Sequence, residues 1–397
     1  ALTLAQKNRH VFLVEKLPCI GGKVALYEDI FPTLECASCV LDPKLDEVLH
    51  NDQIDVLTFS EVEEAVGYYG NFTVKVRRKA RFVDSQTCLG CGACFDVCPV
   101  KVSNEFNEGL DERGAIYVPY AGALPNIAVI DEDRCLHWKD EPCNACEEAC
   151  PFGSINYEEE DELLDLKVGA IVLATGFDLF DPRRAPQYGY GKIENVYTSL
   201  EFERLVNSTG PTGGEIVLKN GEAPKNIALV HCVGSRTSKF HEYCSGVCCT
   251  YLLKLAHQAR QKLPDVGITQ FYSDFCLPGK ESQGFLNRVV REDRVELIHM
   301  KGPDLLEIVE QDQTILITST DVGGQSTSLP VDMVVLAPAI EGARDVHLLA
   351  SVFDIPVDES RFFVEDNPYV APVSTSTDGI FVAGCAQGPL DIQAAAA

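Results

Sequence analysis

Two runs of cysteine constrain this chain more than any other feature. Residues 88–99 read CLGCGACFDVCP, and residues 135–151 carry a second set of four cysteines that also closes on Cys-Pro. The chain holds 17 cysteines in 397 residues, and a chain of this length can bury its cores without disulfide staples. Clustered thiols in such a chain favour metal ligation in a reducing compartment.

The first run has the spacing C-x2-C-x2-C-x3-C-P, which is typical of bacterial ferredoxins. In the second run seven residues separate the first two cysteines, which predicts an enlarged loop over 136–142. Ferredoxins exchange the fourth cysteine between two clusters, and zinc sites fit the Cys-Pro endings less well. We therefore expect two 4Fe–4S clusters, one on Cys88, Cys91, Cys94 and Cys150, the other on Cys135, Cys143, Cys146 and Cys98.

Charge and hydropathy argue against some classes of partner. The chain has 33 Lys and Arg against 60 Asp and Glu, a formal net charge of −27. Such a field repels phosphate backbones and anionic membrane surfaces, so nucleic acid is not expected as a partner. No apolar run approaches the length that spans a bilayer, so we expect no direct membrane insertion and a cytoplasmic location.

The first residues indicate a dinucleotide-binding unit. Residues 1–16 read as the end of a helix and then a buried strand from His10 to Glu15, whose carboxylate can accept hydrogen bonds from ribose hydroxyls. The G-x-G-x-x-G loop would lie about 20 residues before Glu15. That position precedes residue 1, so we expect the chain to be a fragment of a longer protein. An ordinary amphipathic helix and strand is the alternative.

Three further segments favour a flavin. Gly21-Gly22 follow Glu15 at the distance of a close-approach glycine pair, and residues 170–176 (AIVLATG) and 379–385 (GIFVAGC) resemble the second and third signatures of two-dinucleotide-domain flavoproteins. An Asp that holds the ribityl chain normally follows the last Ala-Gly, and Cys385 stands there instead. The predicted FAD contacts are Glu15, Lys16, Gly21, Gly22, Ala174, Thr175, Gly176, Gly384 and Cys385.

A nicotinamide site is expected to have been replaced. The strand Asn226 to His231 is followed by CVGSR, in which Gly234 alone cannot build a phosphate-cradling loop and Arg236 would enter where a small residue should pack. Four thiols converge in its place, which predicts a third cluster; buried, inert cysteines are the alternative. These thiols belong to Cys232, Cys244, Cys248 and Cys249.

The chain resembles the heterodisulfide reductase A-type subunit family over nearly its whole length. The segments that carry the resemblance are CIGG (19–22), FPTLECASC (31–39), the cysteine pattern at 88–151, IVLATGF (171–177), HCVGSR (231–236), YCSGVCC (243–249) and FVAGCAQGP (381–389). The resemblance implies an α/β fold, namely a thioredoxin-reductase-like flavoprotein with two dinucleotide domains and an inserted two-cluster ferredoxin domain of α+β type. It also implies a third cluster beside FAD, on the thiols at 232, 244, 248 and 249.

The expected domain order follows from these segments. We expect an FAD domain at 1–81, the ferredoxin domain at 82–159, a return to the FAD domain at 160–180, a second Rossmann-like domain at 181–345 and the last part of the FAD domain at 346–397.

The resemblance also implies a function and partners. The chain would be an oxidoreductase subunit that passes electrons between clusters, FAD and partner subunits, by electron bifurcation or confurcation, in an anaerobic source. The implied partners are B-type and C-type subunits, a hydrogenase or dehydrogenase module, and ferredoxin. An NAD(P)H-dependent flavin iron–sulfur oxidoreductase and a non-catalytic electron-relay scaffold are the alternatives.

Two constellations have several interpretations. Cys36 and Cys39 form a C-x2-C that could be a redox dithiol, half of a cluster completed by thiols outside this chain, or two core cysteines. Lys254 follows Cys249 by a little over one helical turn and could direct its ammonium toward the flavin, where it would stabilise an anionic reduced form. A solvated helix lysine is the alternative. Cys276 is expected to be structural.

Overall fold

The computed structural model describes residues 1–139 and 143–396. The chain packs into two compact units. The N-terminal unit comprises Ala1–Leu26 and Ala37–Ile171, and the C-terminal unit comprises Tyr27–Cys36 and Val172–Ala397. The domain boundaries expected from the sequence stay predictions.

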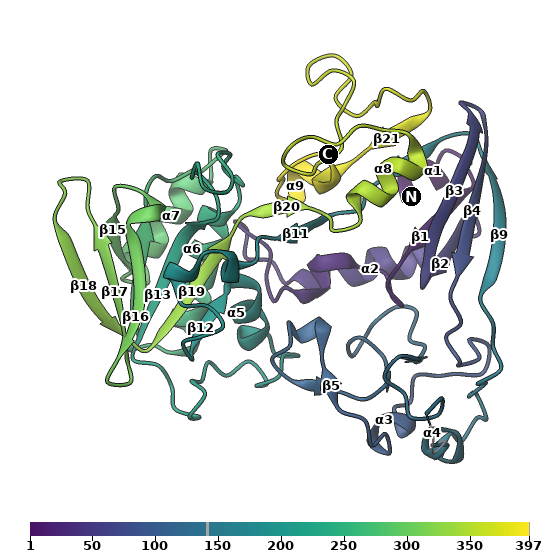
Figure 1. The fold of residues 1–397 in the computed structure, drawn as a ribbon, viewed down its shortest axis with the longest axis horizontal. Coiled ribbons are helices and arrows are strands. Elements are labelled where there is room, and N and C mark those ends of the chain that lie inside the picture. Colours follow the sequence, from purple (N-terminus) through teal and green to yellow (C-terminus); the bar gives the residue numbers. More distant parts are fainter. Residues whose placement is uncertain (140–142, 397) are drawn as a thin grey trace. The chain divides into compact units, whose positions relative to one another are not determined.

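A parallel strand pair opens the N-terminal unit. After the short helix α1 (Leu2–Ala5), β1 (Val11–Glu15) pairs in parallel with β2 (Ile54–Thr58), and α2 (Ala37–Leu49) lies between them in the chain (Figure 1). Apolar side chains of these elements share one small core. The predicted strand that ends at Glu15 is therefore confirmed.

Three antiparallel strands follow in the same unit, and β4 lies at their centre. The strands are β3 (Ser60–Tyr68), β4 (Asn71–Arg78) and β9 (Glu162–Val168). Alternate side chains of β4 are buried, which is the pattern of a strand with one covered face. Both cysteine runs stand in the long connection from β4 to β9.

The connection from β4 to β9 folds into short elements around its own small core. These elements are α3 (Ala93–Asp96), β5 (Val102–Ser103), β6 (Glu112–Arg113), β7 (Ile116–Tyr117), β8 (Val129–Ile130) and α4 (Ala145–Ala149). Each helix starts within a cysteine run, so α3 carries Cys94 and α4 carries Cys146. Phe82 packs on Trp138 in the core, with ring centroids 4.5 Å apart.

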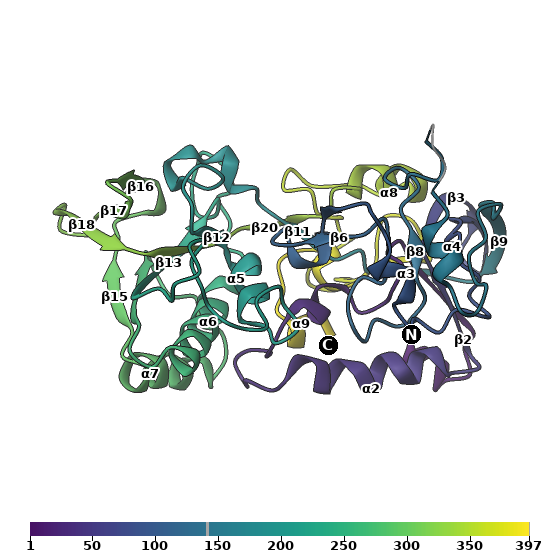
Figure 2. The same ribbon diagram turned by 90° about the horizontal axis from the view of Figure 1, so that it is seen from below.

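A parallel sheet of order β12-β19-β13-β14-β15 forms the centre of the C-terminal unit. In that order the strands are Val196–Thr198, Met333–Pro338, Asn226–Val233, Gly267–Tyr272 and Glu296–His299. The helices α5 (Ser199–Val206), α6 (Cys248–Lys262) and α7 (Ser282–Glu292) lie on one side of this sheet (Figure 2). The antiparallel strands β16 (Leu306–Gln311), β17 (Thr314–Thr320) and β18 (Ser326–Val331) share a core with Ala228 and Val230 of β13. The strand predicted at 226–231 is thus confirmed.

Short strands and helices complete the C-terminal part of the chain. They are β10 (Ile171–Leu173), β11 (Phe177–Leu179), β20 (Ile340–Gly342), α8 (Val346–Phe353), β21 (Ile380–Val382) and α9 (Ile392–Ala396). Sheets join β10 to β21 and β11 to β20. Single turns of 3-10 helix occupy Gly22–Leu26, Glu105–Asn107, Pro182–Arg184, Pro186–Tyr188, Pro303–Leu305 and Gly384–Ala386. The predicted α/β class is confirmed. Among the described residues, no helix has both the length and the apolar character needed to cross a bilayer.

Candidate cofactor sites

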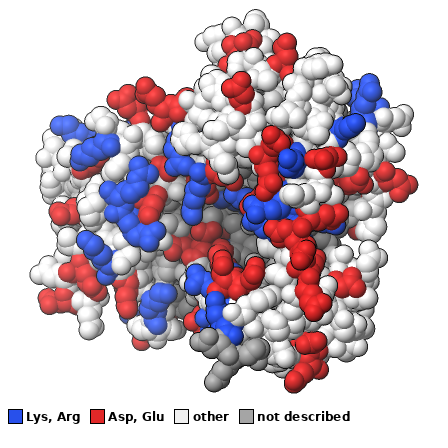
Figure 3. All heavy atoms as spheres, turned by 45° about the vertical axis from the view of Figure 1, so that its right-hand side comes forward, with Lys and Arg blue, Asp and Glu red and all other residues white. Residues whose placement is uncertain are grey.

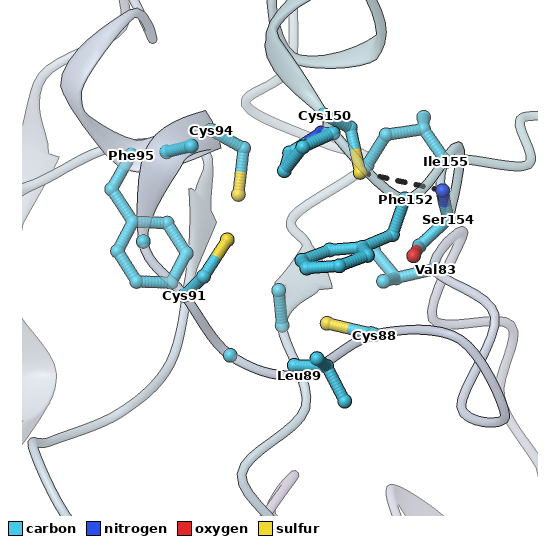
Figure 4. Close-up of a pocket in the computed structure, with 15 residues that line it drawn as sticks. Val83, Cys88, Leu89, Cys91, Cys94, Phe95, Cys150, Phe152, Ser154 and Ile155 are labelled. Carbon is cyan, nitrogen blue, oxygen red and sulfur yellow. Dashed lines mark hydrogen bonds between the residues drawn. The ribbon is translucent and has the colours of Figure 1, made fainter.

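Four thiols of the N-terminal unit line one hollow. Cys88 and Cys91 come from the loop before α3, Cys94 lies on α3, and Cys150 follows α4. Their sulfur atoms point into a shared space, and Phe95, Phe152 and other apolar side chains complete the lining (Figure 4). These are the four cysteines that the exchanged ferredoxin pattern assigns to one cluster.

The other four cysteines of the two runs line a second hollow. Its thiols belong to Cys98, Cys135, Cys143 and Cys146, and its apolar lining includes Ile116. The fourth cysteine of each run therefore lies with three thiols of the other run. Residues 140–142 of the enlarged loop predicted over 136–142 lie outside the described residues.

The two hollows have the donors and the lining that an iron–sulfur cubane needs. Burial raises the pKa of the Cys94 thiol to about 12 and also raises the pKa of Cys135 and Cys146. Such thiols lose their protons when a cation binds the sulfur and stabilises the thiolate, as cluster iron would. Backbone N–H groups donate to Cys150 Sγ from Ser154 at 3.3 Å and to Cys135 Sγ from His137 at 3.4 Å. Over the described part of the chain, no three His, Cys, Asp or Glu side chains converge tightly enough to hold a single metal ion.

A third set of thiols gathers at one end of the parallel sheet in the C-terminal unit. Cys232 lies near the end of β13 with a left-handed φ of 60°, and Cys248 and Cys249 are the first residues of α6. Cys244 comes from the loop between these elements and is exposed, whereas the other three are buried. Burial and the nearby Cys232, Cys249 and Cys244 raise the pKa of the Cys248 thiol, so the four predicted thiols do lie together.

Cys276, which was expected to be structural, joins this set. Its backbone N–H donates to Cys249 Sγ at 3.3 Å, its side chain hydrogen-bonds to that of Cys244, and it is exposed. The cysteine spacing did not predict this contact, because Cys276 is 27 residues from Cys249. The available signal was its place just after β14, since the carboxyl ends of neighbouring parallel strands meet at one edge.

Protein side chains occupy the loop after β13, where a nicotinamide cofactor's pyrophosphate would have been expected. Gly234 has a φ of +81°, and a Cβ placed on it would lie 2.6 Å from the ring of Phe180. The Arg236 guanidinium forms an ion pair with Asp274 at 2.5 Å. Burial raises the pKa of the Cys232 thiol to about 11, and the positive charge of Arg236 partly opposes that rise. Gly234 thus serves packing against Phe180.

The predicted flavin contacts in the N-terminal unit lie after β1. Glu15 ends this strand, and Lys16 follows it directly. Gly21 and Gly22 both have positive φ, of 123° and 54°, and a Cβ placed on Gly22 would meet no atom within 4 Å. The positive φ of both glycines and the open space at Gly22 have the character that a close approach to a cofactor requires.

The predicted flavin contacts in the C-terminal unit follow two short strands. Residues 174–176 come after β10, and Gly176 has a φ of +72°. Gly384 follows β21 with a φ of +60°. The Cys385 thiol donates to the carbonyl oxygen of Leu390 at 3.3 Å, so it contacts the chain's own backbone.

Lys254 is not the solvated helix lysine that was one of its two interpretations. Its side chain is fully buried and forms an ion pair with the fully buried Glu203 of α5. Its ammonium also donates to the carbonyl oxygen of Asp29 at 3.2 Å and lies 4.9 Å from the ring centroid of Tyr251. Burial lowers the pKa of Lys254, and Glu203 opposes that shift.

Cys36 and Cys39 are both disulfide-bonded rather than free thiols. Cys36 directly precedes α2, and Cys39 lies in its first turn. Cys39 is exposed and Cys36 only half-buried, so the interpretation as two core cysteines is wrong. A redox dithiol and half of a shared cluster both stay open.

Comparisons with known proteins match both the cysteine pattern and the whole chain. The 4Fe-4S binding domain family matches residues 82–102. The chain is 38% identical to the A-type subunit of H(2):CoB-CoM heterodisulfide,ferredoxin reductase of Methanothermobacter marburgensis, over 100% of this chain and 60% of that protein. It is 41% identical to the second A-type iron-sulfur subunit of CoB--CoM heterodisulfide reductase of Methanopyrus kandleri, again over 100% and 60%.

Among solved structures, the thioredoxin reductase of T. acidophilum aligns with a TM-score of 0.49 at 11% identity, covering 100% of this chain and 88% of that one. The chain spans about 60% of the length of the curated relatives named above. Along its entire length, this chain is 38% to 41% identical to these A-type subunits of heterodisulfide reductases.

Proposed function

We propose that this chain is an FAD- and iron–sulfur-containing electron-transfer subunit of a heterodisulfide-reductase-like complex, and hence an oxidoreductase. One observation carries the proposal: two neighbouring cysteine runs line two hollows, and each run lends its fourth thiol to the other. This exchange is the ligand arrangement of two-cluster ferredoxins.

Two 4Fe–4S clusters would be held by the eight thiols of these hollows. When bound, such clusters accept and release single electrons at potentials that ligands, hydrogen bonds and solvent exposure determine. The chain supplies the thiolates, the backbone N–H donors of Ser154 and His137, and linings that are largely apolar.

A third 4Fe–4S cluster is proposed on Cys232, Cys244, Cys248 and Cys249. The thiols lie together, and the packing of Phe180 against Gly234 supports the loss of a nicotinamide site there. Arg236 places a positive charge beside Cys232, which favours the thiolate that iron needs.

FAD is proposed to contact Glu15, Lys16 and the Gly21-Gly22 pair, together with residues 174–176, Gly384 and Cys385. The positive φ values of the glycines support close approach of a cofactor to the backbone. When bound, a flavin exchanges electron pairs with one partner and single electrons with clusters. Lys254 would hold its positive charge in a water-free site through Glu203, ready to stabilise negative charge on the ring.

Partners are proposed from the relatives and from the charge of the chain. A relative's name couples the heterodisulfide with ferredoxin, which supports ferredoxin as a partner and bifurcation or confurcation as the mode. B-type and C-type subunits and a hydrogenase or dehydrogenase module would supply the terminal sites, in the cytoplasm. On the face drawn in Figure 3, acidic side chains are spread among basic ones, and the net charge of −27 favours partners with basic docking surfaces.

Iron per chain, measured on anaerobically purified protein, tests this proposal first. Three cubanes correspond to about 12 irons, whereas about 8 would mean the ferredoxin pair alone and would remove the third cluster. Direct reduction of the flavin by NADPH would instead favour the NAD(P)H-dependent oxidoreductase. Protein that holds iron but no flavin would favour the electron-relay scaffold. Stopped-flow oxidation of the flavin by one acceptor alone, in the whole complex, would contradict bifurcation.

A further inference from the structure

A tyrosine hydroxyl contacts one thiol of the second hollow. The Oη of Tyr157 lies 3.1 Å from Sγ of Cys146, and Tyr157 itself stands outside both cysteine runs. Either atom could donate while Cys146 is a free thiol. Once Cys146 binds iron as a thiolate, its sulfur carries no proton, so only the phenol can donate. The contact is then an O–H···S hydrogen bond from Tyr157 to a cluster ligand.

Two neighbouring rings fix the position of this hydroxyl. The His137 ring stacks on Tyr157 with centroids 3.5 Å apart and planes 7° from parallel, and Trp138 meets it edge-on at 5.8 Å. His137 Nδ1 in turn lies 2.9 Å from Oδ1 of Asn144, next to the ligand Cys143. The phenol is therefore packed against the ligand loop and cannot turn away from Cys146 without unstacking.

We propose that Tyr157 is a positioning residue that raises the reduction potential of the cluster held by Cys98, Cys135, Cys143 and Cys146. Reduction of a cubane adds one electron and breaks no bond to the tyrosine, whose proton stays on its oxygen. The extra negative charge is shared with the ligand sulfurs, so a donor aimed at one of them binds the reduced state more strongly. The hydrogen bond thus makes this cluster easier to reduce. This inference rests on the proposed function, which places a cluster there.

The test replaces the hydroxyl and leaves the ring. Tyr157→Phe in the full chain, titrated anaerobically at pH 7 with EPR detection, should lower the midpoint of one cluster and leave the others unchanged. We expect a roughly tenfold fall in the equilibrium constant for reduction, which is about 59 mV for a one-electron couple. Tyr120→Phe is the matched control, because its ring also stacks on an aromatic neighbour while its hydroxyl lies 3.5 Å from the carbonyl oxygen of Ile20 rather than on a thiol.

A second variant is expected to shift the midpoint potential of the same cluster in the opposite direction. Installing 3-fluorotyrosine at position 157 keeps the shape of the ring and makes the phenol a stronger donor, so the same midpoint should rise. Unchanged midpoints in both variants, or an equal shift in Tyr120→Phe, would overturn the inference. If Tyr157→Phe loses iron, the fluorotyrosine protein decides alone. Wild-type protein with fewer than about 8 irons would contradict the proposed clusters themselves, which is a separate outcome.

Discussion

Lys254 and Glu203 form an ion pair from which solvent is wholly excluded, between helices α6 and α5. Removing two charges from water costs several kcal/mol per ion, and mutual attraction offsets that cost only when the geometry is good. Here the ammonium also has the Asp29 carbonyl oxygen and the Tyr251 ring as neighbours. Each charge therefore depends on the other.

Removing one partner of this pair should be far more damaging than removing both. Lys254→Met leaves a buried carboxylate without its cation, which costs about 3–5 kcal/mol. At about 2–4 °C per kcal/mol, the thermal midpoint should fall by roughly 6–20 °C. The double variant Lys254→Met/Glu203→Leu should recover most of that loss. Lys262→Met, at the exposed end of the same helix, is the control. A single variant as stable as this control would contradict the prediction.

The exchange of fourth cysteines predicts which pairs of cysteine substitutions have additive effects on the iron content. Cys91 and Cys150 line the first hollow, and Cys146 lines the second. Cys91→Ser/Cys150→Ser should lose the same four or so irons as either single change, because both remove ligands of one cubane. Cys91→Ser/Cys146→Ser should lose about twice as many. Iron analysis of the anaerobic proteins measures this, and a loss of about eight irons in Cys91→Ser/Cys150→Ser would mean that the ligands are not exchanged.

The five thiols of the C-terminal unit offer more ligands than one cubane uses. Cys248 is buried among the other thiols, whereas Cys276 is exposed and lies against Cys244. Cys248→Ser should therefore lose about four irons per chain, and Cys276→Ser should keep all of them. The EPR signal of the third cluster provides a second readout. Loss of iron in Cys276→Ser would make it a ligand and exclude one of the four thiols assigned from the sequence.

Gly234 should be required for packing rather than for a nucleotide. A methyl group at this position meets the Phe180 ring, and Gly279 has the same φ of +81° with no atom within 4 Å of its Cβ position. Gly234→Ala should therefore lower the thermal midpoint clearly more than Gly279→Ala, which carries only the backbone strain of about 1–2 kcal/mol. Equal effects would show that Phe180 moves aside freely, and the argument against a nicotinamide site would lose its structural support.

Much of the framework follows from local patterns in the sequence. The strand that ends at Glu15, the strand from Asn226 and the helix after Cys249 each have a periodicity or a boundary that a short window contains. The grouping of the ferredoxin-type thiols is equally local, because Cys-Pro spacing determines which loops wrap together.

The residues that the sequence missed depend on packing between distant segments. Glu203 is 51 residues from Lys254, and nothing in its own helix marks it as the partner of a buried cation. Tyr157 reads as the first residue of an acidic stretch, and only the folded loop brings it to Cys146. Cys276 lies beside the other thiols because β14 is the neighbour of β13. Such contacts depend on the topology of the fold, which cannot be predicted from the individual residues.

The crossed arrangement of the two hollows also bears on how the inserted segment matures. Neither hollow can be completed by one cysteine run alone, because Cys98 and Cys150 each lie with the other run. Iron bound in either hollow would have ligands from both cysteine runs and would therefore cross-link the early and late parts of the segment. Synthesis would then have to extend past Cys150 before the first cubane could close, so metal loading and folding of this segment would be one event rather than two.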